Sequence, residues 1–235
     1  MNFDPPLIPA TLLRRYKRFL ADVRLDNGEE LTVHTPNTGS MLGCADPGTR
    51  IWLRDSANPA RKYRYSWELA STAAGIPVGV NTHLANQLVQ EAIEQGVIPE
   101  LQGYTQIRRE VKYARGSRID LLLSAPGRVD CYVEIKNVTA LAEGQSAIFP
   151  DAPTERGRKH LQALRDMVRA GYRAVLVLHV ARDDARAFRP AAEIDPAYAR
   201  LLGEVHAQGV EVLAWVSHVS SHAIGLYRSV PVRLA

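Results

Sequence analysis

Short strand-like runs of hydrophobic and polar residues follow one another from residue 12 to residue 80. The first, KRFLADVRL, is separated from ELTVHT by Asp26-Asn27-Gly28, and Asn-Gly tolerates the positive φ angles that a tight hairpin turn needs. The next runs, TRIWLRDS, KYRYSWELA and IPVGV, are separated by Pro-Gly, Asn-Pro and Ala-Gly pairs. About five short strands without a convincing helix predict an OB-like β-barrel in residues 1–81.

The pattern changes near residue 81. Between Leu84 and Gly96 apolar residues recur at helical spacing, with Thr82 as the expected cap and Gly96 as the expected end of a helix. The runs YTQIRREVKY, SRIDLLLS and DCYVEIKNV are then expected to form consecutive antiparallel strands. Further along the chain we expect a helix at 154–170, a strand in YRAVLVLHV, a helix at 196–208 and a strand in VEVLAWV.

Strands that alternate with helices require parallel crossovers, so residues 82–235 are predicted to form an α/β domain with a mixed sheet. The fold class is therefore mixed α+β, with a barrel followed by this domain. The chain of 235 residues, 46% hydrophobic and 23% charged, has the composition of a globular protein with a sizeable core.

Bulk properties restrict the location and the partners of the chain. Cys44 and Cys131 are too few for a disulfide framework and lack zinc-ligand spacing, so we expect reduced thiols. No apolar run reaches the roughly 18 residues of a membrane span, and the N-terminus lacks a signal-peptide pattern, so we expect a cytoplasmic protein without a membrane partner. The net charge of +4 permits a polyanionic partner but does not require one.

Two of the predicted strands carry acidic residues that alternation and register bring together. Glu134 and Lys136 project from the same face of one strand. If the preceding hairpin is centred on Gly127, Asp120 lies directly opposite Glu134, with Cβ atoms about 4.5–5.5 Å apart. Two carboxylates at that distance repel each other unless they share a cation such as Mg²⁺, and Lys136 could then hold a water or offset charge on a phosphate. The pattern indicates phosphodiester hydrolysis.

Spacing alone also permits an ordinary surface pair of Glu134 and Lys136, because E-x-K occurs by chance in many proteins. Asp120 and Glu134, however, interrupt otherwise apolar strands. Partly buried carboxylates need partners or a metal, so this context favours a site over a solvated surface.

Longer stretches of the chain resemble a known family. They are NTGSM (37–41), NPARKYRYSWEL (58–69), SRIDLLL (117–123), YVEIKNVT (132–139), FPDAPTERGRKHL (149–161) and EIDPAYARLL (193–202). With them the chain resembles the sugar fermentation stimulation protein family of bacteria and archaea. Asp120 followed by Glu134-Ile135-Lys136 resembles the motif of the PD-(D/E)XK nuclease superfamily.

That resemblance implies an OB-type domain followed by a PD-(D/E)XK nuclease-like domain, in a DNA-binding protein with a suggested role in regulating sugar (maltose) metabolism. It implies that Asp120 and Glu134 are ligands of Mg²⁺ or Mn²⁺ and that Lys136 is the catalytic lysine. Nuclease relatives often add a glutamate from the first helix, here Glu91, with Glu110 as the competing candidate.

Basic residues supply candidates for nucleic-acid binding. Arg156, Lys159 and His160 are three and four residues apart at the start of a predicted helix, where they could hold a phosphate or form a solvated basic face. In the first half, basic and aromatic residues are interleaved at Arg61, Lys62, Tyr63 and Arg64. OB-type sheets bind nucleic acid with this combination, although alternation along a strand also allows Tyr63 to be a core residue.

Two functional hypotheses follow. The first is a DNA-binding, Mg²⁺-dependent endo- or exonuclease in which the barrel holds the strand that Asp120, Glu134 and Lys136 cut. The second is a catalytically idle DNA-binding regulator with the same fold. Intact acidic and basic residues at all three positions favour the first.

Overall fold

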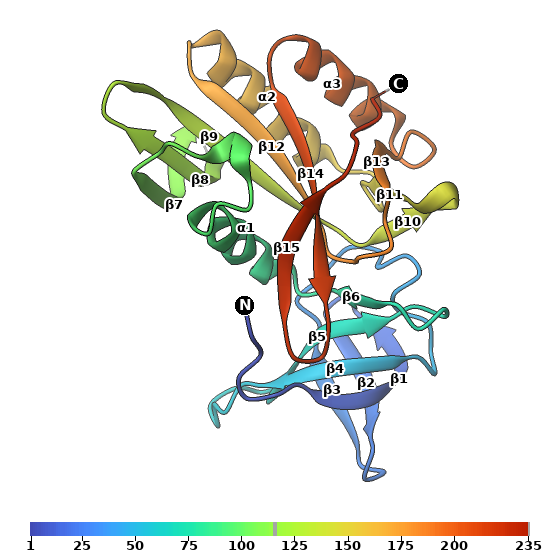
Figure 1. Cartoon of the computed structure of the whole chain (residues 1–235). Helices are drawn as coiled ribbons and strands as arrows, with labels where there is room; N and C mark the ends of the chain where they lie inside the picture. Colours follow the sequence, from blue (N-terminus) through green and yellow to red (C-terminus); the bar gives the residue numbers. More distant parts are fainter. Residues whose placement is uncertain (115–116, 235) are drawn as a thin grey trace.

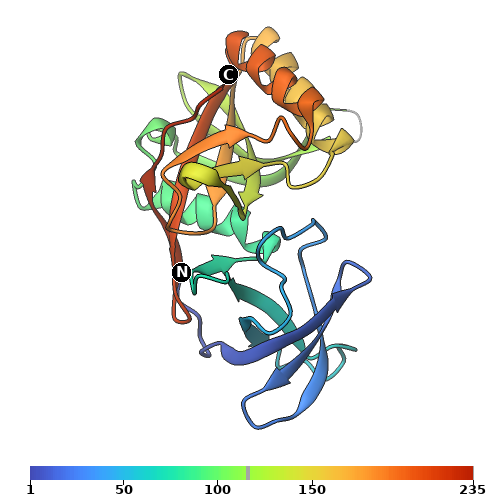
Figure 2. The ribbon, with the colours of Figure 1, turned by 90° about the vertical axis from the view of Figure 1, so that its right-hand side faces the viewer.

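The structure, a computed structural model, describes residues 1–114 and 117–234. A barrel formed by the N-terminal part lies below a layered α/β domain (Figures 1 and 2). The strands of the barrel are β1 (Ile8–Tyr16), β2 (Leu20–Leu25), β3 (Glu30–His34), β4 (Arg50–Asp55), β5 (Tyr65–Ser71) and β6 (Pro77–Gly79). Their order is β3-β2-β1-β4-β5-β6, and a bridge between His34 and Ser66 joins β3 to β5 and closes the barrel. The predicted OB-like barrel is confirmed.

Strand β1 is absent from the strands predicted from the sequence. The pairing of β1 with β2 shifts between Leu12 and Arg14, so the two-residue alternation is broken in the middle of the strand. Lys17 and Arg18 then adopt φ angles of 49° and 66° in the turn to β2. Because the bulge hides the alternation, the sequence pattern begins only with β2.

The run KYRYSWELA is a strand only in its second half, because β5 begins at Tyr65. Residues 61–64 lie in the loop between β4 and β5. At the base of this loop the backbone N–H of Ser56 donates to the carbonyl of Arg64 at 3.0 Å, and the Arg64 guanidinium pairs with Asp55 at 2.5 Å. The prediction of a strand through Arg61–Arg64 is therefore wrong.

Helix α1 (Ala85–Glu94) opens the second domain after a short 3₁₀ turn (Thr82–Leu84). Asn81, rather than Thr82, caps this turn by accepting a hydrogen bond from the backbone N–H of His83 at 3.0 Å. The Thr82 hydroxyl instead donates to the carbonyl of Pro36 in the barrel at 3.1 Å. Gly96, with φ of 76°, follows the end of the helix as predicted.

A six-stranded mixed sheet forms the centre of the second domain, as predicted. Its strands are β7 (Gln106–Ala114), β8 (Ser117–Ala125), β9 (Arg128–Val138), β12 (Arg173–Val180), β14 (Glu211–Val219) and β15 (Ile224–Ser229). The order is β15-β14-β12-β9-β8-β7; β12 runs parallel to β9 and β14, and the other pairs are antiparallel. Helix α1 packs on one face, whereas α2 (Glu155–Arg169) and α3 (Pro196–Ala207) pack on the other.

Several short elements were not predicted from the sequence. They are β10 (Ala140–Ala142), β11 (Ser146–Phe149) and β13 (Ala187–Pro190), which form a small sheet, the edge strand β15, and the 3₁₀ turns Pro99–Leu101 and Glu143–Gln145. Strands of three or four residues are too short for alternation to reveal. Among the described residues, no helix has the length and apolar character needed to cross a membrane. Cys44 and Cys131 are buried free thiols.

The barrel is joined to the second domain through β6 and the N-terminal residues. The backbone N–H of Gly79 donates to the carbonyl of Ala181 at 2.7 Å. A Cβ at Gly79 would lie 2.7 Å from the terminal methyl of Ile224, so a larger residue here would displace that side chain. The N-terminal amine donates to the carbonyl of Ile224 at 3.0 Å, and the β14–β15 hairpin reaches down beside the barrel (Figure 1). These contacts fix the barrel at one edge of the sheet.

The carboxylate of Asp195 ties the two helices of one face together. It caps α3 by accepting from the backbone N–H of Tyr198 at 2.9 Å, and it accepts from the backbone N–H of Thr154, the cap of α2, at 2.9 Å. Arg158 adds an ion pair at 2.8 Å. Burial opposes the ionisation of Asp195, but the two N–H groups and the Arg158 charge outweigh it and hold its pKa below the ordinary value.

We expect Asp195→Ala to lower the free energy of unfolding by about 2–4 kcal/mol at neutral pH, because it removes a helix cap and leaves a buried N–H without an acceptor. Asp195→Asn should cost less, since it keeps one acceptor oxygen. The pKa is lowered on folding, so the stabilisation exists above the ordinary pKa of aspartate and is lost as the pH falls through the lowered value. Urea unfolding at pH 7 and at about pH 3 measures both effects; equal losses at the two pH values would contradict the ionic part.

Candidate active site

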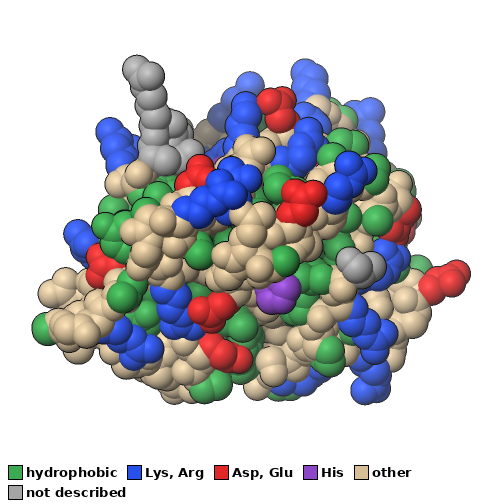
Figure 3. Space-filling model, turned by 90° about the horizontal axis from the view of Figure 1, so that it is seen from above, with side chains coloured by type: hydrophobic (Ala, Val, Ile, Leu, Met, Phe, Trp, Pro, Cys, Tyr) green, Lys and Arg blue, Asp and Glu red, His purple; other side chains and the backbone are tan. Residues whose placement is uncertain are grey.

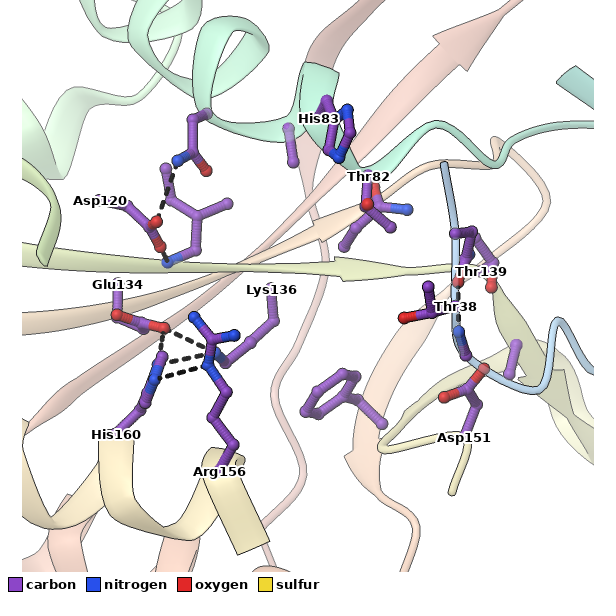
Figure 4. Close-up of a pocket in the computed structure, with 18 of the residues that line it drawn as sticks. Thr38, Thr82, His83, Asp120, Glu134, Lys136, Thr139, Asp151, Arg156 and His160 are labelled. Carbon is purple, nitrogen blue, oxygen red and sulfur yellow. Dashed lines mark hydrogen bonds and ion pairs between the residues drawn. The ribbon is translucent and has the colours of Figure 1, made fainter. Parts of the chain in front are cut away.

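A pocket of about 660 Å³ lies where the barrel meets the second domain. The barrel contributes its loop around Thr38, and the second domain contributes the start of α1, the middle of β8 and β9, and the first turns of α2 (Figure 4). The charged side chains that line it are Glu110, Asp120, Glu134, Lys136, Asp151 and Arg156, together with His83 and His160. Acidic and basic groups therefore face the same space.

Asp120 lies at the point where β8 separates from β9. The two strands pair at Leu121 and Val133, so one further step of the ladder places Asp120 opposite Glu134, as expected from a hairpin centred on Gly127. Instead of a continued ladder, the Asp120 carboxylate accepts the backbone N–H of Ile135 at 2.7 Å. The side chain thus occupies the gap between the diverging strands.

Glu134 and Lys136 share one face of β9, as alternation predicts. The Lys136 ammonium lies 2.6 Å from Oε1 of Glu134, whose side chain is buried. His160 from α2 contacts the same carboxylate oxygen, and Nε of Arg156 donates to Nε2 of His160 at 3.3 Å (Figure 4). Burial opposes the ionisation of Glu134, but the His160 hydrogen bond and the Lys136 charge hold its pKa below the ordinary value.

The second carboxylate has the opposite shift. Burial, followed by the charge of Glu134, raises the pKa of Asp120 to about 6, against hydrogen bonds from Ile135 and from the amide of Asn86 at 2.9 Å. The shift shows that the two acids repel each other across a partly desolvated space. A small cation between them would relieve that repulsion.

The donor set fits a hard divalent cation bound partly by water. Within residues 1–114 and 117–234, no group of three or more His, Cys, Asp or Glu side chains is arranged to hold a metal ion. Mg²⁺ is commonly bound through one or two carboxylates and keeps several waters. Asp120 and Glu134 supply such a pair, so the pocket suits Mg²⁺ better than a metal that needs a complete cage of side chains.

The structure does not bring Glu91 to this pocket. Its carboxylate pairs with the N-terminal amine at 3.1 Å and accepts from Gln95 at 3.1 Å. Asn86, which lines the pocket, precedes Glu91 by five residues, and about 100° per helical residue turns Glu91 roughly 140° away. Glu110, the competing candidate, does line the pocket, and its carboxylate accepts from Asn86 at 3.4 Å.

The predicted basic residues of α2 separate into two groups. Arg156 and His160 line the pocket. Lys159 instead forms an exposed ion pair with Glu155 at 3.0 Å, outside the pocket. The upper end of the molecule shows Lys and Arg side chains interspersed with acidic ones (Figure 3), so charge on that surface does not by itself identify a binding face.

The basic loop of the barrel, residues 61–64, lies outside the pocket lining. Lys62 lies over the ring of Tyr63 at 5.5 Å, and Arg64 is paired with Asp55. Burial, followed by the charges of Arg61 and His83, lowers the pKa of His34. Of these residues, His83 lines the pocket.

Asp151 is a pocket residue that sequence reasoning missed. Its carboxylate accepts the hydroxyl of Ser40 at 3.0 Å and the backbone N–H of Met41 at 3.1 Å. Arg15 holds the other side of this barrel loop by donating to the carbonyls of Asn37 and Gly39 at 2.9 Å each. The stretches NTGSM and FPDAP, which contain Ser40, Met41 and Asp151, are among those that carry the family resemblance. No local spacing rule could have predicted their contact, because Ser40 and Asp151 are 111 residues apart.

Comparison with known proteins places these features in a wider group. Residues 83–223 match the family model described as "Sugar fermentation stimulation protein RE domain", and residues 13–80 match "SfsA N-terminal OB domain". Proteins described as "Sugar fermentation stimulation protein homolog" are 50% identical in Shewanella piezotolerans and 52% in Shewanella loihica, over the full length of each chain. A solved structure, Pyrococcus furiosus SfsA in complex with Ca²⁺, is 31% identical with a TM-score of 0.89, covering 99% of this chain and 98% of that one.

The electrostatic coupling of the two acids is directly measurable. We expect Glu134→Gln to lower the pKa of the Asp120 carboxyl from about 6, because it removes the neighbouring negative charge. The pKa should remain above the ordinary value, since burial is the larger cause of the shift. Carboxyl-carbon NMR titration in EDTA measures this change. Glu91→Gln, outside the pocket, is the control and should leave the Asp120 pKa unaltered.

Proposed function

Because the chain belongs to the sugar fermentation stimulation protein family, we propose that it binds DNA and hydrolyses phosphodiester bonds with a divalent cation, Mg²⁺ or Mn²⁺. The observation that carries this proposal is the convergence of Asp120, Glu134 and Lys136 where β8 and β9 separate, in a pocket walled by an OB domain. Each of the three side chains has a role that hydrolysis of a phosphodiester requires.

Asp120 and Glu134 are the proposed cation ligands. Support comes from the Pyrococcus furiosus relative, which is in complex with Ca²⁺, a cation that like Mg²⁺ takes oxygen ligands. When bound, such a cation lowers the pKa of a coordinated water and polarises a phosphoryl oxygen. The burial of Glu134 and the partial burial of Asp120 fit this role, because two neighbouring carboxylates with little access to water are costly until positive charge joins them.

Basic side chains of the pocket would act on the phosphate. Lys136, next to Glu134, can hold an attacking water or offset charge on the phosphate. Arg156 and His160, at the start of α2, face the same space and can hold a non-bridging oxygen. Thr154 caps this helix by accepting the N–H of Gly157 at 3.0 Å, which fixes the turn that carries both residues.

The alternative function is a DNA-binding regulator of sugar metabolism with an idle site. The arrangement of Asp120, Glu134 and Lys136 in one pocket supports the hydrolytic function, because an idle protein gains nothing from two neighbouring acids with little access to water. A regulator would still bind DNA through the barrel and would tolerate replacement of either acid.

Measuring cation binding in variants tests which acidic residues act as ligands. We expect isothermal titration with Mn²⁺ to detect one site that is lost in Asp120→Asn and in Glu134→Gln. Glu110→Gln should weaken binding about ten-fold, because Glu110 shares the Asn86 amide with Asp120. Glu91→Gln should bind as the wild type does, since its carboxylate faces the N-terminal amine. Equal effects of Glu91→Gln and Glu110→Gln would contradict this assignment.

Cleavage tests the hydrolytic function itself. We expect the purified protein with Mg²⁺ or Mn²⁺ to cleave oligonucleotides and EDTA to stop it. Asp120→Ala with Lys136→Ala should reduce the rate by about 1,000-fold, because the cation and the amine are lost together. Lys159→Met, on the same helix but outside the pocket, should retain the rate. Cleavage by the wild type no faster than by the double variant, with DNA binding intact, would establish the regulator instead.

A further inference from the structure

The pocket has a wall on each side. Thr38 and Asp151 lie across the pocket from Asp120 and Glu134 (Figure 4). The barrel loop of that wall is tied to Asp151 through Ser40 and Met41, at 3.0 and 3.1 Å. A Cβ at Gly39 would lie 2.8 Å from the Asp151 carboxylate, so this joint is tightly packed. The two domains therefore enclose the site rather than leave it open on a flat surface.

The enclosed volume limits what can reach the acids. About 660 Å³ is the size of a small-molecule pocket, with room for about one or two nucleotides. Intact B-DNA cannot enter this space as a whole, because its major groove alone is about 12 Å wide, and a duplex can present only one backbone phosphate to the mouth of the pocket. One strand can pass between the walls, whereas two paired strands cannot.

A row of tyrosine rings leads away from the site along the sheet. Tyr132 precedes Glu134 by two residues on β9, so both side chains share a face. The ring of Tyr132 lies 5.5 Å from that of Tyr113 and 5.3 Å from that of Tyr172. Burial, followed by the charges of Glu134 and Asp120, raises the pKa of Tyr113, so the row begins close to the acids. It ends at Tyr172, which is 42% exposed, whereas Tyr113 and Tyr132 are partly buried and pack against the core under α2.

Arginine side chains accompany this row. Arg108 is paired with Leu122, and Leu122 with Tyr132, so the three side chains project from one face of neighbouring strands. Arg118 precedes Asp120 by two residues on β8, and Arg108 and Arg118 are both exposed. Aromatic rings for stacking, with guanidinium groups for the backbone, are the combination that proteins use for single strands. In a duplex the base faces are already stacked on one another and cannot use these rings.

We propose that the site takes single-stranded nucleic acid, whose bases stack on the tyrosine row of Tyr113, Tyr132 and Tyr172 while one phosphate enters the walled pocket. This inference rests on the proposed function and specifies its substrate. The strand first meets the exposed Tyr172, next to Tyr132, which precedes Glu134 by two residues on β9. Free strands and unpaired ends are substrates, and an uninterrupted duplex is not.

Binding in EDTA tests the row without cleavage. A fluorescein-labelled oligothymidylate of about 20 nucleotides and a duplex of equal length are titrated with protein, and anisotropy is measured. The single strand should bind more tightly than the duplex. Tyr172→Ala should weaken single-strand binding about ten-fold, Tyr172→Phe should restore it, and Tyr227→Ala is the matched control, because Tyr227 is 49% exposed on a different strand. Equal losses from Tyr172→Ala and Tyr227→Ala, or tighter duplex binding, would overturn the proposal.

A second measurement locates the strand independently of affinity. An oligothymidylate carrying 5-iodouridine is irradiated with the wild-type protein in EDTA, and the cross-linked peptide is identified by mass spectrometry. We expect cross-links at Tyr172 or Tyr132 and not at Tyr227. Cross-links confined to the barrel would contradict binding at the tyrosine row, even if the single strand binds well.

The cleavage assay separates this inference from the proposed function. Faster cleavage of duplex than of single strand would overturn the inference and leave the hydrolytic function standing. Binding and cross-linking through Tyr172 without any cleavage would support single-strand binding by the tyrosine row and contradict the proposed hydrolytic function. Cleavage of single strands that falls in Tyr172→Ala, through KM more than through kcat, supports both.

Discussion

The separation of β8 from β9 after Leu121 and Val133 is the constraint on which the site depends. Up to that pair the two strands are an ordinary hairpin. Beyond it, the Asp120 carboxylate takes the N–H of Ile135, so the backbone stays satisfied although the ladder has ended. Because the Asp120 carboxylate replaces a backbone acceptor, its position between the two strands is fixed by a hydrogen bond. Glu134, the residue before Ile135 on β9, directs its carboxylate to Lys136 and to His160 of α2.

Charge balance in the pocket follows from that geometry. Lys136 and His160 both contact Oε1 of Glu134, which keeps this acid ionised although it is buried. Asp120 has only neutral donors, the N–H of Ile135 and the amide of Asn86, so burial and the Glu134 charge dominate there. Glu134 is thus kept ionised, whereas the ionised form of Asp120 would be stabilised by an added positive charge. The asymmetry arises because Lys136 of β9 and His160 of α2 both contact Glu134, whereas Lys136 acts on Asp120 only through its charge.

Alternation and turn chemistry predicted the parts of this arrangement that are local. The pairing of Glu134 with Lys136 on one face needed only the two-residue period. The register to Asp120 agrees with the expectation because a register shift between Leu123 and Ala125 follows the Ala125–Arg128 pair at the turn. Contacts between segments far apart in the sequence could not be predicted in this way. Glu91 pairs with the N-terminal amine, 90 residues away in the sequence, and no sequence pattern predicts that pair. Local irregularities hid other features, such as the φ of 52° at Glu110 and the loop that replaces a strand at residues 61–64.

The barrel contributes more to the site than a surface for nucleic acid. Its loop at Asn37–Ser40 is held from below by Arg15 and from the opposite domain by Asp151, so it is rigid although it is a loop. This wall limits how much solvent and how large a ligand can reach the acids, and it strengthens the interactions of Asp120 and Glu134 by lowering the dielectric around them. If the barrel were attached by a flexible linker alone, the two acids would be solvated and their repulsion would be weak. The charged and hydrogen-bonding groups that set the pKa of Asp120 belong to the second domain, so the barrel wall can act on that pKa only through the burial it adds.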